Sequence, residues 1–290
     1  MADVHALVQD LGGFAHKRQL VARGARDIDL TRAVRAREVV RVRRGWYTTE
    51  RESPRVRALR IGGRLTGISA IIAWRGWVLG NHPLHVSVAD NSARLRPTGR
   101  GVRLHWDSRD IRDRGTATSV GLIDALVRVV LDETLETAVA ALDWALHTGR
   151  LDRIDFELVI LALPKNRRWI AHWVDERCES LPESLSRTRL RVAGHSVESQ
   201  VRLGGERIDL LIDRVVGLET DGEEFHRDSF ERDRRKDLAI IAANYSPLRI
   251  PARMVFYEWE AVASAVDQLL HMRGTESQPT IQRRARGPSR

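Results

Sequence analysis

The sequence predicts an α/β multi-domain protein, and three observations lead to this fold class. The chain has 290 residues, of which 42% are hydrophobic, so it exceeds a usual single domain and can bury a sizeable core. The first fifty residues contain three short segments of helical periodicity followed by an alternating basic segment. After residue 181, strand-like and helix-like segments alternate. We therefore expect separate domains at the two ends, joined by a connector.

The first fifty residues predict three helices and a hairpin. Apolar residues between positions 4 and 11 have helical spacing and end at a Gly-Gly pair, and residues 17–22 form a second short helix before Gly24. Asp29 is placed to cap a third helix over residues 30–40, and residues 40–49 read as a β-hairpin with Arg44-Gly45 at its tip. This order is typical of a winged helix-turn-helix domain, which we place at residues 1–52.

Basic residues occupy the positions that a winged helix-turn-helix presents to DNA. Its third helix enters the major groove, and its hairpin lies near phosphates. The residues concerned are Arg32, Arg35 and Arg37 on the predicted helix and Arg41, Arg43 and Arg44 on the hairpin. Residues 1–60 hold 14 Lys and Arg against 7 Asp and Glu, which suits phosphate binding. Double-stranded DNA is the predicted partner, and the alternative is a small helical domain with an ordinary solvated basic face.

Residues 53–180 predict an α/β connector without chemistry of its own. Strand patterns cover residues 82–90 and 101–107, and helical patterns cover residues 122–132, 135–149 and 154–163. His82, His85 and His105 have no recognisable ligand spacing, so no metal is expected there. Cys178 is the only cysteine, which excludes a disulfide framework and a thiolate-rich zinc site.

Residues 181–272 predict a second α/β domain with the element order αβββαβα. Gly204-Gly205 lies between two alternating segments and predicts a hairpin. A helix over residues 229–245 allows a crossover that makes the third and fourth strands parallel. The predicted elements are a helix at 183–194, strands at 197–203, 206–213, 215–221 and 247–252, and a closing helix at 258–272. Residues 273–290 are predicted to be a disordered basic tail.

Three acids stand in strands that otherwise look buried. Because side chains alternate along a strand, Asp209 faces away from Ile208 and Leu210, and Glu219 and Asp221 share one face of the next strand. Neighbouring carboxylates repel one another unless they are protonated or neutralised. Oxygen ligands favour Mg²⁺ or Mn²⁺, which can activate water against a phosphodiester. The pattern predicts such a metal site, and the alternative is exposed strand residues on a solvated sheet face.

Residues 182–255 carry motifs of a known family in the family's order. These are Glu183, Ile208-Asp209-Leu210, Glu219-Thr220-Asp221-Gly222, Phe225-His226 and residues 230–235. The segment resembles the PD-(D/E)XK restriction-endonuclease-like fold, in particular the branch similar to very-short-patch mismatch repair endonucleases. The resemblance implies that Asp209 is the first metal-binding aspartate, Glu219 the acid of the second motif, and His226 a proton-transfer group. Catalysis is expected to involve Asp209, Glu219, Asp221, His226 and Glu183.

One position departs from the family's pattern and leaves alternatives open. Asp221 stands where the wider fold carries lysine and the repair branch carries histidine. Lys236 on the following helix is either a substitute for that lysine or part of a solvated helix face. Glu183 either belongs to the site or caps its helix, since Ser180 and Glu183 have the spacing of a capping box.

The N-terminal region has a resemblance of its own. Residues 12–24, GGFAHKRQLVARG, and residues 43–49, RRGWYTT, resemble the winged-helix domain of AbiEi-type (type IV) antitoxins. This implies DNA binding or autoregulation, and a cognate toxin as a partner. Two functions follow: a metal-dependent DNA endonuclease, or a non-catalytic DNA-binding regulator with a degenerate nuclease domain.

Retention of Asp209, Glu219 and His226 favours the endonuclease, and the missing lysine favours the regulator. The chain has no basic leader and no apolar segment that approaches the ~18 residues of a membrane span. We therefore expect a soluble cytoplasmic protein with no membrane partner.

Overall fold

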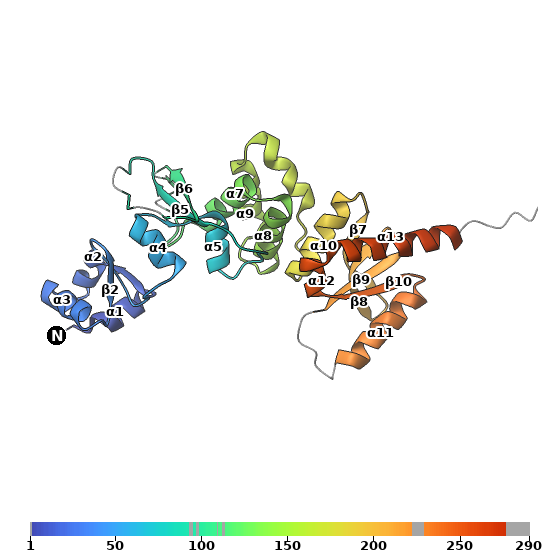
Figure 1. Cartoon of the computed structure of the whole chain (residues 1–290), viewed down its shortest axis with the longest axis horizontal. Helices are drawn as coiled ribbons and strands as arrows, with labels where there is room; N and C mark the ends of the chain where they lie inside the picture. The colour runs from blue at the N-terminus through green and yellow to red at the C-terminus, as the bar shows by residue number, and fades with distance from the viewer. Residues whose placement is uncertain are drawn as a thin grey trace, which may run out of the picture. The chain divides into compact units, whose positions relative to one another are not determined.

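The computed structural model describes residues 2–92, 95–96, 99–108, 110–111, 114–221 and 229–276, without the side chains of residues 229–234 and 274–276 (Figure 1). These residues form a mixed α/β protein with three separate β-sheets, which confirms the α/β class. The chain divides into two compact units, Met1–Val174 and Asp175–Arg290. Among the described residues, no helix combines the length and apolar character that a bilayer crossing requires.

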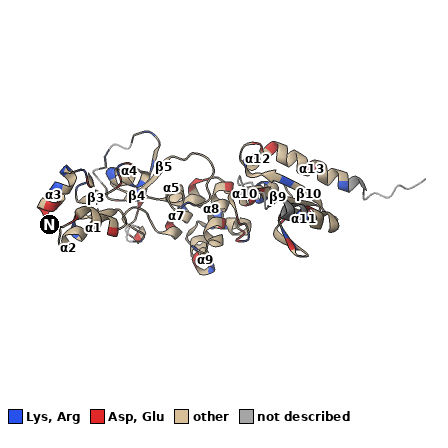
Figure 2. Ribbon diagram, turned by 90° about the horizontal axis from the view of Figure 1, so that it is seen from below, with Lys and Arg blue, Asp and Glu red and all other residues tan. Residues whose placement is uncertain are grey.

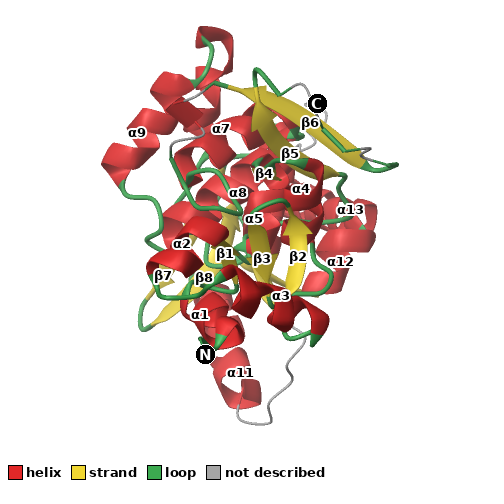
Figure 3. Ribbon diagram, turned by 90° about the vertical axis from the view of Figure 1, so that its left-hand side faces the viewer, coloured by secondary structure: helices red, strands yellow, loops and turns green. Residues whose placement is uncertain are grey.

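The first fifty residues form three helices around a small antiparallel sheet with the strand order β1-β3-β2 (Figure 3). A buried cluster that includes Val8, Leu20, Leu30 and Tyr47 holds the helices on the sheet. Strand β1 was not predicted, because three residues are too few for a periodic pattern. The elements are α1 (Val4–Asp10), β1 (Phe14–His16), α2 (Lys17–Ala22), α3 (Asp27–Arg35), β2 (Val40–Arg43) and β3 (Trp46–Thr48).

Helix α3 begins and ends earlier than predicted. Its first residue is Asp27, and Asp29 accepts a hydrogen bond from the backbone N–H of Arg26 at 3.1 Å, so Asp29 caps the helix from inside its first turn. The helix ends at Arg35, and Arg37 has the left-handed φ of 61°. The placement of Arg37 on this helix is therefore wrong, because the chain reverses there to bury Val39.

The middle region combines a three-stranded sheet with a helical layer. The sheet has the order β4-β5-β6, with β5 and β6 parallel. Its core cluster contains Val86, Leu126 and Leu142. The predicted strands and helices appear as β5 (Leu84–Ala89), β6 (Val102–Asp107), α7 (Leu122–Asp132), α8 (Leu135–His147) and α9 (Arg153–Ala162). Four elements were not predicted, namely α4 (Pro54–Ile61), β4 (Arg64–Leu65), α5 (Gly67–Ala73) and the 3-10 helix η1 (Lys165–Trp173).

Helix α4 explains why the N-terminal and middle regions form one unit. Val56 and Leu59 pack against Phe14 and Val42 of the N-terminal region. On its other side the helix contributes Ala58 to the core of the middle region. The sequence-based boundary at residue 52 therefore lies inside the first compact unit.

The second unit contains a four-stranded mixed sheet with the order β10-β9-β8-β7. β9 and β10 are parallel, while β7–β8 and β8–β9 are antiparallel. Its elements are α10 (Leu181–Val192), β7 (Val197–Leu203), β8 (Glu206–Ile212), β9 (Val216–Asp221), α11 (Ser229–Ala242), β10 (Ser246–Pro251), α12 (Ala252–Tyr257) and α13 (Trp259–Glu276). The predicted strand and helix order is observed with α12 added. Helix α13 extends into the predicted tail, and residues 277–290 lie outside the described residues.

Candidate active site and nucleic-acid interface

Strands β8 and β9 separate at the position of the strand acids. Their antiparallel register runs from Ile212↔Val216 to Leu210↔Leu218. Beyond this point β8 remains paired with β7, and β9 remains paired with β10. The backbone groups on the facing edges of this fork therefore need partners other than the neighbouring strand.

Asp209 and Glu219 supply those partners with their carboxylates. The backbone N–H of Asp209 donates to Oε1 of Glu219 at 3.1 Å, and the backbone N–H of Thr220 donates to Oδ2 of Asp209 at 2.8 Å. The Thr220 hydroxyl also donates to Oδ2 of Asp209, at 3.3 Å. Asp209 and Glu219, two of the three strand acids, thus lie side by side, each capping the opposite strand.

Lys236 completes this cluster from helix α11, which connects β9 to β10. Its Nζ lies 2.6 Å from Oε2 of Glu219, and only 18% of the lysine side chain and 4% of the glutamate side chain are exposed. Of the two roles left open for Lys236, a solvated helix face does not fit this contact. Strand β9 carries no lysine, but Lys236 reaches Glu219 from helix α11.

Glu183 and Gln200 border the cluster on the α10 and β7 side. Glu183 is buried and accepts hydrogen bonds from the Ser180 hydroxyl at 2.6 Å and the Glu179 backbone N–H at 3.0 Å, so it does cap the helix. It also accepts from Nε2 of Gln200 at 2.7 Å. Gln200 has a φ of 56°, which is uncommon for a residue with a side chain and occurs often at functional sites.

The surroundings raise the pKa of all three carboxyls. Burial is the largest cause for Glu183 and Asp209, and it raises the pKa of Glu219 to about 7, with the charge of Asp209 as the next cause. The charge of Asp209 also raises the pKa of Glu183. Lys236 acts in the opposite direction on Glu219 and Asp209. The cluster is thus poor in solvating water and rich in negative charge, which favours a bound cation.

Asp221 lies at the end of β9 but has a strong partner of its own. Arg249 of β10 donates to Oδ1 of Asp221 at 3.0 Å and to Asp237 at 3.4 Å. The negative charge of Asp221 raises the pKa of Asp209. Asp221 therefore adds negative charge near Asp209, while its own carboxylate is bound by Arg249. The role of Arg249 was not predicted from the sequence.

The donor set fits a hard divalent cation bound partly by water. Oδ1 of Asp209 accepts no hydrogen bond from the residues that the structure describes, and Glu219 lies directly beside it. These acids do not bring three ligand atoms within 4.8 Å of one another. An ion here would take few protein oxygens and complete its shell with water and substrate phosphate, which is how Mg²⁺ is commonly bound. His226 lies outside the described residues.

The arginines predicted to bind DNA are largely exposed in the first unit. Arg32 and Arg35 lie on α3, which has acidic residues in its first turn and basic residues in its last (Figure 2). Arg41 and Arg44 of the hairpin line an open cavity of about 900 Å³ together with Lys17, Arg18 and Thr31. This cavity between α2, α3 and the hairpin is the basic cleft.

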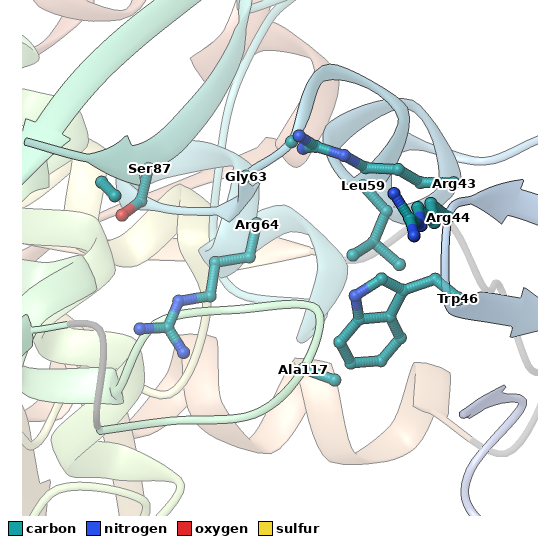
Figure 4. Close-up of a pocket in the computed structure, with 10 residues that line it drawn as sticks. Arg43, Arg44, Trp46, Leu59, Gly63, Arg64, Ser87 and Ala117 are labelled. Atoms are coloured by element: carbon teal, nitrogen blue, oxygen red, sulfur yellow. The ribbon is translucent and has the colours of Figure 1, made fainter. Parts of the chain in front are cut away.

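Arg43 is oriented differently from its neighbours on the hairpin. Its guanidinium lies against Gly62, the residue that ends helix α4, where a cation faces the negative end of the helix dipole. Arg43, Arg44 and Trp46 line a second, smaller cavity of about 280 Å³ with Gly63 and Arg64 (Figure 4). Backbone carbonyls of Ile111 and Thr116 hold Arg64 at 2.9 and 3.0 Å.

Sequence spacing gave no reason to expect a metal near the connector histidines, but the fold brings two of them together. One ligand atom from each of His85, His105 and Asp132 lies within 4.8 Å of the others. Residues 20 positions apart in the sequence meet here because β5 and β6 are paired in parallel. The ligands of such a site are not close together in the sequence, so a search for short ligand motifs could not find the site.

Comparison with known proteins adds no functional assignment. No family model matches this chain, and no curated protein matches it. The crystal structure of the Rv2827c protein from Mycobacterium tuberculosis is similar over 64% of this chain and 79% of that chain, with 16% sequence identity and a TM-score of 0.30. The function is therefore derived from the sites themselves.

Proposed function

We propose that the protein is a metal-dependent DNA endonuclease that hydrolyses phosphodiester bonds and is directed to duplex DNA by an N-terminal winged helix-turn-helix domain. The observation that carries the proposal is the meeting of Asp209, Glu219 and Lys236 at the fork between β8 and β9. Two hard carboxylates and one ammonium in a largely buried setting are the groups that phosphodiester hydrolysis needs.

Each residue of the cluster has a defined task in this proposal. Asp209 and Glu219 would hold Mg²⁺ or Mn²⁺, which lowers the pKa of a bound water and stabilises charge on the attacked phosphate. Lys236 would orient the attacking water and stabilise negative charge, as the motif lysine does in the family that this domain resembles. Glu183, which accepts a hydrogen bond from Gln200, would add negative charge to the site, and His226 is proposed for proton transfer on the resemblance alone.

The N-terminal region supplies DNA affinity in this proposal. Helix α3 would enter the major groove with Arg32 and Arg35, and the hairpin would place Arg41 and Arg44 near the phosphates. The basic cleft between these elements supports this arrangement, since its lining includes Arg18 as well, although Lys17 there is paired with Asp27 at 2.7 Å.

The test is nicking of supercoiled plasmid in Mg²⁺ or Mn²⁺, with EDTA as the metal-free control. We expect cleavage by the wild type and its loss in Asp209→Asn, since the amide keeps the size of the side chain without its charge. Asp267→Asn is the matched control, because Asp267 lies on α13 with a side chain 68% exposed. Thermal midpoints and circular dichroism show whether each variant is folded.

One observation favours a second function, that of a non-catalytic DNA-binding regulator. Lys236 pairs with Glu219 and Arg249 pairs with Asp221, so two of the acids are already paired with protein cations, as expected of a degenerate nuclease site. Wild-type protein that binds duplex DNA but neither binds Mn²⁺ nor nicks plasmid would support the regulator, with a cognate toxin as its partner.

A further inference from the structure

The first unit holds a second cluster of side chains that can bind a metal ion. It contains two histidines and an aspartate, whereas the fork between β8 and β9 offers carboxylates. His85 of β5 and His105 of β6 lie on the same face of the sheet, because the parallel register pairs His85 with Arg103 and His105 with Ser87. Their ring centroids are 4.9 Å apart. Asp132, the last residue of α7, closes the cluster from the helical layer.

These side chains are buried without the partners that buried polar groups normally have. His85 is 1% exposed, His105 is 6% exposed, and the Asp132 side chain is 8% exposed. Among the described residues, Nδ1 of His85, Nε2 of His105 and Oδ2 of Asp132 have no hydrogen-bond partner. Native proteins satisfy nearly all such atoms, so the unpaired Oδ2 of Asp132, which faces Nδ1 of His105 at 3.6 Å, indicates a missing ligand between these two side chains.

The distances between donors fit ligands of one ion better than a hydrogen-bond network. Nδ1 of His105 lies 3.6 Å from Oδ2 of Asp132, and Nε2 of His85 lies 3.7 Å from Oε1 of Glu133. Both exceed hydrogen-bond length. Two ligand atoms of a tetrahedral zinc ion, each bonded at about 2.0–2.1 Å, lie roughly 3.3 Å apart. The His105–Asp132 pair is close to this spacing, and a ligand atom of His85 lies within 4.8 Å of both residues, so a contraction of the cluster would let all three bind one ion.

The charge state of the cluster also suits a cation. Burial disfavours the charged form of both imidazoles, and a neutral imidazole keeps a lone pair for a metal. Arg103 donates to Oδ1 of Asp132 at 2.8 Å and leaves Oδ2 available. Glu133 adds a second carboxylate, while Arg128 is engaged by Asp107 at 3.3 Å.

We propose that His85, His105 and Asp132 form a binding site for a divalent transition-metal ion, with zinc as the ion that best matches the donors. Two imidazoles and a carboxylate are a usual zinc set, and Glu133 or water would supply the fourth ligand. Mg²⁺ prefers an all-oxygen shell, so the site differs in selectivity from the carboxylate fork. An ion here would join β5, β6 and α7, which makes its role structural.

The test uses the full chain carrying Asp209→Asn and Glu219→Gln, prepared without a histidine tag, so that the fork does not contribute metal binding. After chelation and dialysis, we expect the protein to bind one Zn²⁺ per chain by calorimetry and elemental analysis. Co²⁺ in place of zinc should give the visible absorption of a four-coordinate nitrogen and oxygen site. Zinc should also raise the thermal midpoint.

Replacing His105 with glutamine should weaken zinc binding by about 100-fold or more, since changes to outer-shell partners alone cost about 10–100-fold. His5→Gln is the matched control, because His5 is an exposed histidine of the same unit. If His105→Gln does not fold, the Co²⁺ spectrum of the parent chain decides the matter. Failure of the parent to bind Zn²⁺, a six-coordinate Co²⁺ spectrum, or full binding by His105→Gln would each overturn the proposal.

Discussion

Asp209 and Glu219 stabilise the strand fork and also carry the charge of the proposed active site. As capping groups they satisfy backbone N–H donors that the separated strands leave unpaired. Burial raises the pKa of both carboxyls, the charge of Asp209 adds to the rise for Glu219, and the charge of Asp221 adds to the rise for Asp209. In the proposed function these carboxylates serve both the local backbone and a bound cation.

Lys236 is the residue whose replacement tests the chemistry most directly. We expect Lys236→Met to lower the nicking rate by about 10²–10³-fold, the loss typical of one electrostatic stabiliser, with Mn²⁺ binding retained. Lys236→Arg should recover part of the rate because it keeps the charge. Lys165→Met is the control, since Lys165 is exposed on η1. Equal rates for wild type and Lys236→Met would remove Lys236 from the mechanism.

The raised pKa of Glu219 has a consequence for stability in metal-free protein. A carboxyl whose pKa of about 7 in the folded state exceeds its ordinary value of 4.5 binds a proton more tightly in the folded state. Its contribution is therefore fully present below pH 4.5 and lost as pH rises through about 7. In EDTA, we expect the free energy of unfolding to fall across this interval by on the order of 1–3 kcal/mol.

Urea unfolding of wild type and Glu219→Gln from pH 4 to 8 isolates this effect, because other titrating groups are common to both chains. The difference between the two unfolding free energies should change with pH mainly between 4.5 and 7. A difference that stays constant over this range would show that Glu219 is not the titrating group.

At the scale of elements, the turn between α4 and β4 fixes how the two halves of the first unit join. A side-chain carbon at Gly63 would lie 2.2 Å from the backbone oxygen of Ser87 and 2.6 Å from Val86. Backbone cannot move aside as a flexible side chain can, so we expect Gly63→Ala to destabilise the unit by roughly 1–3 kcal/mol. Gly205→Ala, which meets no atom within 4 Å, should leave the thermal midpoint unchanged, and similar midpoints for both variants would contradict this packing.

The individual arginines of α3 and the hairpin should make unequal contributions to DNA binding. Arg35→Ala and Arg44→Ala should each reduce the slope of log K against log salt by roughly 0.9, the effect of one lost phosphate contact. Arg43→Ala should change the slope less, because its guanidinium lies against Gly62. Fluorescence anisotropy with a duplex at several salt concentrations measures all three, and a larger effect for Arg43 than for Arg44 would contradict the observed orientation.

At the scale of the whole molecule, the proposed function places DNA binding in the first compact unit and phosphodiester hydrolysis in the second. The clusters around Leu30, Leu59 and Leu142 use residues before 175, and the cluster around Ile208 uses residues after it. We therefore expect fragments 1–174 and 175–290 to fold separately. The first should bind duplex DNA, and the second should retain metal-dependent nicking with a higher KM. Nicking by the first fragment alone would refute this division.

Much of the local structure was readable from sequence because it depends on neighbouring residues. Helical spacing and the glycines that follow it placed α2 at residues 17–22 as observed, and Gly204-Gly205 marked the β7–β8 turn. Strand alternation put Glu219 and Asp221 on one face of their strand, and the antiparallel register of β8 and β9 brings Asp209 beside Glu219. By itself, the sequence determined these elements and their order in the second unit.

Tertiary structure alone decided which distant groups meet those residues. Lys236 reaches Glu219 only because α11 crosses over the sheet, and Arg249 reaches Asp221 only because β10 pairs in parallel with β9. His85 and His105 come together through the register of two parallel strands, and Asp132 joins them through helix packing. Contacts of this kind depend on how whole elements bury their apolar faces against one another, which no local pattern of residues encodes.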